Sequence, residues 1–314
     1  MIDFRYHLVS VIGIFLALAV GIVLGTAAAN GVVLDNLNGQ VNRLRTDKGD
    51  LRKTLDDLQT ESNAGKAFVK LWLPTLVAHR LADQRVAVLS APGTPSGLRT
   101  DVVAALRQAG ATVTSQVQIS ADYVDPARDA TLASVVSSLG SAEGDAPTRS
   151  GAELAAARLA TALVAKRSGR APAAEESTRV LTAFQRAGMI DLTGNGNPNA
   201  ASLAVLLAAP AEKGKNDATK ASDTVLLALA VALDVGSDGA VISGPLTATA
   251  NDGLLAAARS SNDVRHAVGT VDSADSPVGQ VETVLALAAQ LRGEAVAWGT
   301  GPGTSAPVIS LSSS

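Results

Sequence analysis

Residues 272–276 hold the pair of carboxylates in this sequence that most resembles a reaction site, Asp272 and Asp275. They follow a predicted strand at Arg265–Val271 and precede a helical stretch that starts with proline. Two neighbouring carboxylates can act as an acid and a base, or hold a cation. An Asp or Ser directly before such a proline is also typical of a helix N-cap. We favour the N-cap, formed by Asp275 or Ser276, over a reaction site.

Two loops that contain glycine could approach a ligand with their backbones. The loop Ala91–Gly97 follows the β-branched run Arg85–Ser90 and precedes a helical stretch. It lacks both the GxGxxG pattern and the lysine of a P-loop, so a plain strand–helix turn is favoured over a ligand site. A second run, Gly299-x-Gly301-x-Gly303, follows a predicted strand but is followed by prolines rather than a helix. A nucleotide fingerprint requires that helix, so we reject the match.

Soft metal ligands are scarce in the chain. Its 314 residues include no Cys, 2 Met and 3 His, and the histidines (His7, His79 and His266) stand far apart in sequence. The sequence therefore predicts no disulfide, no metal site and no cysteine nucleophile. A net charge of −3 and an aromatic content of 3% argue against a nucleic-acid partner. We expect neither enzymatic activity nor a cofactor from these residues.

A long apolar segment lies near the N-terminus. No charged residue occurs from Leu8 to Leu34, and the most apolar part, 8–29, has 22 residues. As a helix this part measures about 33 Å, enough to cross a bilayer core of roughly 30 Å. The alternative, a signal peptide cleaved near Ala27 and Ala29, normally has a shorter apolar core. We predict one uncleaved span at 8–29, a short cytoplasmic N-terminus at 1–7 and an extracytoplasmic remainder.

Two repeats predict that this N-terminal part pairs with a second copy. Within the span, small residues recur every four positions, which lets two membrane helices approach closely. After it, heptads over 31–62 carry Leu at every d position and one Lys at a, a pattern that favours a parallel dimer. Asp47 and Arg52 could then pair between chains, whereas the alternative is an amphipathic helix docked on its own domain. The membrane-pairing residues are Gly13, Ala17, Gly21 and Gly25. The coiled-coil interface is Leu34, Leu37, Val41, Leu44, Lys48, Leu51, Leu55 and Leu58.

The rest of the chain alternates strands with helices. The strands are near-continuous runs of Val, Leu and Ala, which indicates a mostly parallel sheet covered on both faces. The fold class is therefore α/β, with an extracytoplasmic domain at 66–298 and a Gly/Ser-rich tail at 299–314. The predicted strands are 85–90, 111–119, 189–193, 202–208, 240–243, 265–271 and 295–298. The predicted helices are 66–82, 98–109, 128–139, 151–167, 175–187, 220–233, 251–260 and 277–291.

Two unusual strings and the heptads between them carry a family resemblance. The strings are FRYHLVSVIGIFLALAVGIVLGT at the start and TVDSADSPVGQVETVLALAAQLRGEAVAWGTG at Thr270–Gly301. Together they resemble the mycobacterial copper transport protein B family, MctB, over essentially the whole chain. The resemblance implies an actinobacterial envelope protein linked to copper efflux or tolerance, described as a channel-forming outer-membrane transporter. The chain is also similar to the SteB envelope proteins, which partner a second protein in cell division and the control of peptidoglycan hydrolysis.

These observations lead to one expected function and two alternatives. Copper is implied by the resemblance alone, and a single span cannot enclose a pore by itself. We therefore expect a dimeric, single-pass protein in the lipid bilayer that serves copper homeostasis by docking a partner protein. The first alternative is a division or cell-wall scaffold that docks an envelope partner through its stalk and has no direct copper role. The second is an extracytoplasmic enzyme or receptor that uses the loops at 91–97 and 272–276.

Overall fold

The computed structural model describes residues 4–140, 149–169, 171–193, 201–211, 217–250 and 253–305. For residues 4–5, 27–38 and 217–219 it describes the backbone alone. The chain divides into two compact units, Met1–Gly65 and Lys66–Ser314.

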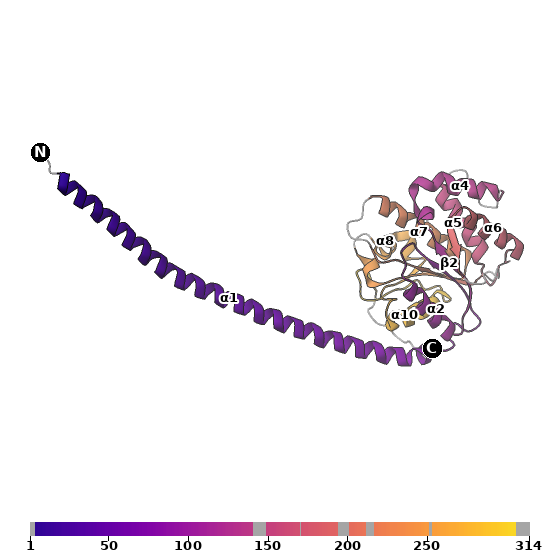
Figure 1. Cartoon of the computed structure of the whole chain (residues 1–314). Helices are drawn as coiled ribbons and strands as arrows, with labels where there is room; N and C mark the ends of the chain where they lie inside the picture. Colours follow the sequence, from indigo (N-terminus) through magenta and orange to yellow (C-terminus); the bar gives the residue numbers. More distant parts are fainter. Residues whose placement is uncertain are drawn as a thin grey trace. The chain divides into compact units, whose positions relative to one another are not determined.

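Helix α1 (Phe4–Val77) is one continuous helix of 74 residues (Figure 1). Its segment Tyr6–Thr26 is long and apolar enough to cross a membrane by length and composition. The prediction of a separate helix at 66–82 is wrong, because residues 66–77 are the last turns of α1. A glycine inside a helix costs only about 1 kcal/mol relative to alanine, so Gly65 does not end it.

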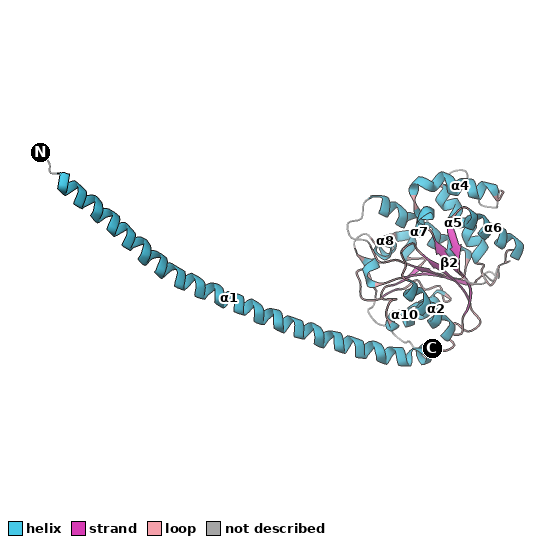
Figure 2. Ribbon diagram, viewed as in Figure 1, coloured by secondary structure: helices cyan, strands magenta, loops and turns pink. Residues whose placement is uncertain are grey.

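Seven strands form one sheet within the described residues, in the order β3-β2-β1-β4-β5-β6-β7. Figure 2 shows the strands in magenta among the helices of the domain. All neighbouring strands are parallel except β2 and β3, which are antiparallel. The α/β class and the mostly parallel sheet are thus confirmed. The strands are β1 (Arg85–Ser90), β2 (Thr112–Ile119), β3 (Ile190–Leu192), β4 (Leu203–Leu207), β5 (Ala240–Ser243), β6 (Gly269–Val271) and β7 (Ala297–Trp298).

Helices and short 3-10 turns connect these strands. The α-helices of the domain are α2 (Ser96–Gln108), α3 (Ala121–Val124), α4 (Asp129–Ser138), α5 (Gly151–Leu163), α6 (Ala174–Arg186), α7 (Asp217–Gly236), α8 (Leu254–Ser260), α9 (Asn262–Arg265) and α10 (Pro277–Gln290). The 3-10 turns are η1 (Pro126–Arg128) and η2 (Leu246–Thr249). Gly110 follows α2 with a φ of +89°, the left-handed conformation that suits glycine after a helix.

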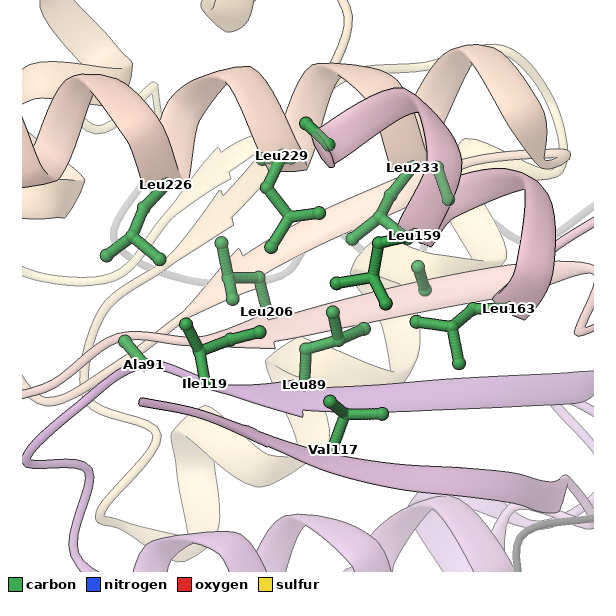
Figure 3. Packing of buried hydrophobic residues seen from close by; sticks show 14 of the residues in the cluster. Leu89, Ala91, Val117, Ile119, Leu159, Leu163, Leu206, Leu226, Leu229 and Leu233 are labelled. Atoms are coloured by element: carbon green, nitrogen blue, oxygen red, sulfur yellow. The ribbon is translucent and has the colours of Figure 1, made fainter. Parts of the chain in front are cut away.

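The central strands are apolar throughout because both faces of the sheet are covered. Every residue of β4 is buried, and its alternate side chains enter two separate cores. In one core, Leu89 and Leu206 of the sheet pack against leucines of α5 and α7 (Figure 3). In the other, α2, α10 and the last turns of α1 cover the opposite face. Burying each such leucine contributes about 1.5–3 kcal/mol.

Two predicted elements differ from the structure at their ends. The predicted strand at 265–271 is wrong in its first half, because Arg265 ends helix α9, residues 266–268 form a turn, and pairing starts only at Gly269. Val264 of α9 is buried in the hydrophobic core of the domain. Its apolar side chain therefore contributes to helix packing rather than to a strand. The predicted helix at 151–167 ends at Leu163, because Val164 is extended and forms a bridge with Ala201.

Candidate functional site

The sheet changes direction between β1 and β4. Strands β2 and β3 lie on one side of β1, whereas β4 to β7 follow one another on its other side. In open α/β sheets, ligands bind outside the carboxyl ends of the strands at such a switch point. Because β1 and β4–β7 are parallel, their carboxyl ends share one edge, and this edge is the candidate site.

A cavity of about 330 Å³ lies at the switch point itself. The predicted loop 91–97 contributes its first residues, and the loop after β4 forms the facing wall. The residues that line the cavity have apolar side chains or are glycine, apart from Ser222 and Asp223 of α7. The cavity is lined by Ala91, Pro92, Gly93, Val124, Ala209, Pro210, Ala211, Ser222, Asp223, Leu226 and Leu254.

A second, larger cavity of about 550 Å³ adjoins the same edge. It lies between α7, α8 and the loop that contains Pro302 and Gly303. Asp223 lines both cavities, so the two hollows meet along α7. The described walls of this cavity include Lys220 and Arg259, but the guanidinium of Arg259 is used within the fold.

A buried ion pair stands beside the second cavity. Nη1 of Arg259 donates to Oδ2 of Asp272 at 2.8 Å, and both side chains are almost completely buried. The backbone N–H groups of Thr300 and Gly301 donate to the same carboxylate at 2.8 and 3.1 Å. A Cβ at Gly299 would overlap Oδ1 of Asp272. The glycine-containing segment 299–303 therefore surrounds the carboxylate of Asp272 in its own chain.

Arg259 also ties the segment after β6 and β7 together. Its Nε donates to the Thr270 hydroxyl at 3.1 Å, and its Nη1 and Nη2 donate to the carbonyl oxygens of Pro302 and Trp298, each at 3.0 Å. The buried guanidinium of Arg259 thus donates four hydrogen bonds. Removing one member of a buried charge pair costs about 3–5 kcal/mol, because the other charge stays uncompensated. The arrangement therefore stabilises the segments that follow β6 and β7 at the carboxyl edge of the sheet.

Glu282 of α10 is a second buried carboxylate in this region, 1% exposed. The Ser273 hydroxyl donates to its Oε2 at 3.4 Å. Burial, assisted by the charge of Asp272, raises the pKa of Glu282 to about 7, while Ser273 and Arg259 act in the opposite direction. Ser273 itself has a φ of +71°, a conformation that non-glycine residues rarely adopt. Glu282 therefore exchanges its proton near neutral pH.

The predicted pair Asp272 and Asp275 is not brought together as a site. Asp275 is exposed, and the helix cap is Ser276, whose hydroxyl accepts from the N–H of Gly279 at 3.2 Å. The predicted N-cap is thus confirmed, whereas Asp272 is the buried partner of Arg259. Sequence reasoning missed Arg259 and Glu282. Each is the sole charged residue of its helix, α8 for Arg259 and α10 for Glu282, and this was the available signal.

Copper-binding side chains do not converge in the part of the chain that the structure describes. Within these residues there is no group of three or more His, Cys, Asp or Glu that could hold a metal ion. His79 and His266 are exposed, and Met189 is 1% exposed in the core. Copper favours sulfur and imidazole ligands, so this donor set does not fit a copper site.

The predicted pairing residues lie along α1. Gly13, Ala17, Gly21 and Gly25 are exposed, and apart from the adjoining backbone of α1 no described atom lies within 4 Å of the position that a Cβ would take at the three glycines. The interface residues from position 41 onward are exposed, and the side chains of Leu34 and Leu37 lie outside the described residues. A row of exposed leucines marks a surface that an assembly or a membrane covers. The row comprises Leu44, Leu51, Leu55 and Leu58, each 56–67% exposed, with Val41 at 42%.

Comparisons with known proteins extend over both compact units. A family model described as "Copper transport outer membrane protein, MctB" matches residues 1–309. The chain is 27% identical to the copper transporter MctB of Mycobacterium tuberculosis (strain ATCC 25618 / H37Rv), over 99% of this chain and 100% of that protein. It is 28% identical to the protein of the same name from Mycobacterium leprae (strain TN), over 91% of this chain and 92% of that protein.

Proposed function

The chain belongs to the MctB copper transport family, and from this premise we propose that it serves copper homeostasis as an anchored protein of the cell envelope. The observation that carries the proposal is the family match over residues 1–309, which includes the apolar helix and the α/β domain. The family description names transport at the outer membrane, and the relatives are named copper transporters. Because that description names transport rather than a reaction, the proposal includes no catalysis.

The anchor of this proposal is Tyr6–Thr26 of α1, retained as a single membrane span. Its side chains include Ile14, Phe15 and Leu16, which are 65–67% exposed. Lipid covers such a surface, and a helix satisfies its own backbone groups inside the bilayer. The N-terminus then lies in the cytoplasm, and the α/β domain lies outside it.

Two copies pair along α1 in this proposal. The small-residue stripe of the span supports close helix approach, and the exposed leucines of the following heptads support a parallel coil. Pairing would remove the leucine row from water, which a lone helix cannot do. A dimer also presents two α/β domains to one partner.

The copper role is carried through a partner protein rather than through a copper site of this chain. The described residues assemble no metal-binding group, and one span per chain encloses no pore. The exposed stalk and the two cavities at the sheet edge are surfaces on which a partner can dock. Copper titration of the purified chain should therefore show no binding above that of a control protein without soft ligands.

Copper sensitivity tests the proposal in the host cell. Deleting the gene should raise cellular copper and lower growth in copper-supplemented medium, and the full chain should restore both. Leu16→Arg should not restore them, because an arginine at the centre of a span costs about 2.5–3.5 kcal/mol on insertion. Leu8→Arg, near the end of the span, is the matched control and should restore both. Unchanged copper content in the deletion strain would contradict the proposal.

A second candidate function is a scaffold for cell division or wall remodelling, without a direct copper role. The scarcity of copper ligands among the described residues favours it. In that case the deletion strain would show defective cell separation while its copper content stays normal. Deleting heptads from the stalk would then abolish recovery of the division partner in a pull-down. Normal separation of the deletion strain would contradict this candidate.

A further inference from the structure

The last turns of α1 carry an exposed apolar patch in the second compact unit. Phe68, Trp72 and Leu76 are 64%, 47% and 38% exposed, although all three are large and apolar. The rings of Phe68 and Trp72 lie 6.2 Å apart. On the neighbouring stripe of the same helix, Leu73 and Val77 are buried in the core of the domain. These turns are therefore held against their own domain by one stripe, while the patch faces away from that core.

The patch lies in register with the leucine heptads. Leu44, Leu51 and Leu58 occupy successive d positions, and the same count continues through Gly65 to Trp72. Positions a continue in the same way from Leu55 through Ser62 and Val69 to Leu76. A heptad repeat keeps all a and d positions on one side of a supercoiled pair. After Leu58 the apolar seam is thus interrupted at Ser62, Gly65 and Val69, the last of which packs against the core of its own domain, before it resumes at Trp72 and Leu76.

Charged positions beside the seam match a second copy of this chain. In a parallel pair, a residue at g lies next to the e position five residues further along the other helix. Asp47 and Arg52 have this relation, and so do Glu61 and Lys66. The second pair flanks the interruption at Ser62 and Gly65 and offers opposite charges there. The complementarity is to the same sequence in the same register.

We propose that the patch of Phe68, Trp72 and Leu76 docks the identical patch of a second copy. The inference rests on the dimer of the proposed function and extends it, because the paired seam then reaches turns that belong to the folded α/β domain. Trp72 meets Trp72 of the second copy at d, and Leu76 meets its counterpart at a. Each domain is then held at the seam by its own α1 turns.

Cysteine cross-linking tests the seam position by position, because the chain has no cysteine of its own. Leu51→Cys reports on the stalk, Leu76→Cys and Trp72→Cys report on the patch, and Leu71→Cys is the control. Leu71 falls at c and is 75% exposed, so the thiol introduced by Leu71→Cys is accessible but points away from the seam. With the full chain in detergent and diamide as oxidant, the control should give at least about fivefold less disulfide-linked dimer than Leu51→Cys or Leu76→Cys, because c positions face away from the partner helix.

The outcomes separate this inference from the proposed dimer. If Leu51→Cys cross-links but neither patch variant does, the patch docks something else and the inference is overturned while the dimer stands. If none of the variants cross-links, both are overturned. Efficient cross-linking at Leu71→Cys would show random collision and would also overturn the inference.

Charge reversal tests the register independently. Lys66→Glu in the Leu76→Cys chain should lower the yield of linked dimer, because Glu61 then faces a like charge across the seam. Adding Glu61→Lys should restore the yield. A double variant that stays as low as the single one would overturn the in-register pairing.

Discussion

The two compact units use their apolar side chains in opposite ways. Leu206 in β4 is 1% exposed and contacts both neighbouring strands and covering helices, whereas Leu51 in α1 is 67% exposed. The α/β domain buries most of its apolar residues within one chain. The N-terminal unit instead leaves the apolar side chains of its described part exposed. A change in the domain should therefore alter folding, and a change in α1 should alter association.

The largest expected effect comes from the buried ion pair. Arg259→Ala should lower the free energy of unfolding of the domain by about 3–5 kcal/mol, because it leaves the Asp272 carboxylate buried without its countercharge. Urea unfolding of the full chain in detergent, followed by near-UV circular dichroism, measures this. Arg292→Ala is the control, since its pair with Glu294 is exposed and such pairs contribute about 0–1 kcal/mol. Equal losses of unfolding free energy in the two variants would refute a stabilising role for the buried ion pair.

A pair of leucine truncations addresses the comparison directly. Leu206→Ala should cost about 2–5 kcal/mol of unfolding free energy, because it leaves a cavity between packed layers. Leu55→Ala should change it by less than about 0.5 kcal/mol, because Leu55 is 59% exposed in the single chain. The same variant should weaken the proposed dimer, measured by analytical ultracentrifugation in detergent. A domain destabilised as much by Leu55→Ala as by Leu206→Ala would mean that the stalk folds back on it.

Glycine substitutions probe the loop around Asp272. Gly299→Ala should destabilise the domain by about 1–3 kcal/mol beyond the cost of its backbone conformation, because the added methyl group overlaps the Asp272 carboxylate. Gly293→Ala is the control, with a φ of +77° and, among the described residues, no atom within 4 Å of the new Cβ. Thermal unfolding of both variants provides the comparison. Similar melting temperatures would show that Gly299 is required only for its φ.

The pH dependence of stability should reveal Glu282. Its pKa rises from 4.5 to about 7 on folding, so the folded chain holds this proton more tightly than the unfolded chain. The unfolding free energy should therefore be highest below the unfolded pKa and fall by about 1–3 kcal/mol as the pH rises through the folded one. Glu282→Gln should remove this fall and stabilise the domain at pH 8 more than at pH 5. Urea midpoints at the two pH values measure it, and identical midpoint shifts would count against a buried proton.

Local patterns in the sequence were sufficient to predict most of the elements. The runs at β1 and β5 are β-branched or apolar at nearly every position, and their predicted bounds match the structure. The strand at 265–271 was predicted too long, because the periodicity of a short apolar run does not distinguish a buried helix from a strand. Local pattern also separates the two units, since the heptad leucines Leu44–Leu58 are exposed whereas most apolar residues of the domain are buried.

The candidate site was much less predictable than the fold. Arg259, Asp272 and Gly301 come from three separate segments, and only the order of β5, β6 and β7 brings them together. The glycine spacing at 299–303 was visible in the sequence, but its carboxylate partner was not. The raised pKa of Glu282 likewise depends on packing around α10 that no local pattern encodes.

The loop around Asp272 also sets the order in which the domain can be completed during synthesis. Two of the N–H groups that hold this carboxylate come from Thr300 and Gly301, and two carbonyl oxygens that hold Arg259 come from Trp298 and Pro302. A ribosome adds these residues after nearly the whole sheet. Until they emerge, the nascent domain has an internal charge pair without its full shell of partners. In the proposed topology, export before that moment would carry an incompletely folded chain across the membrane, and the domain would complete its folding on the far side.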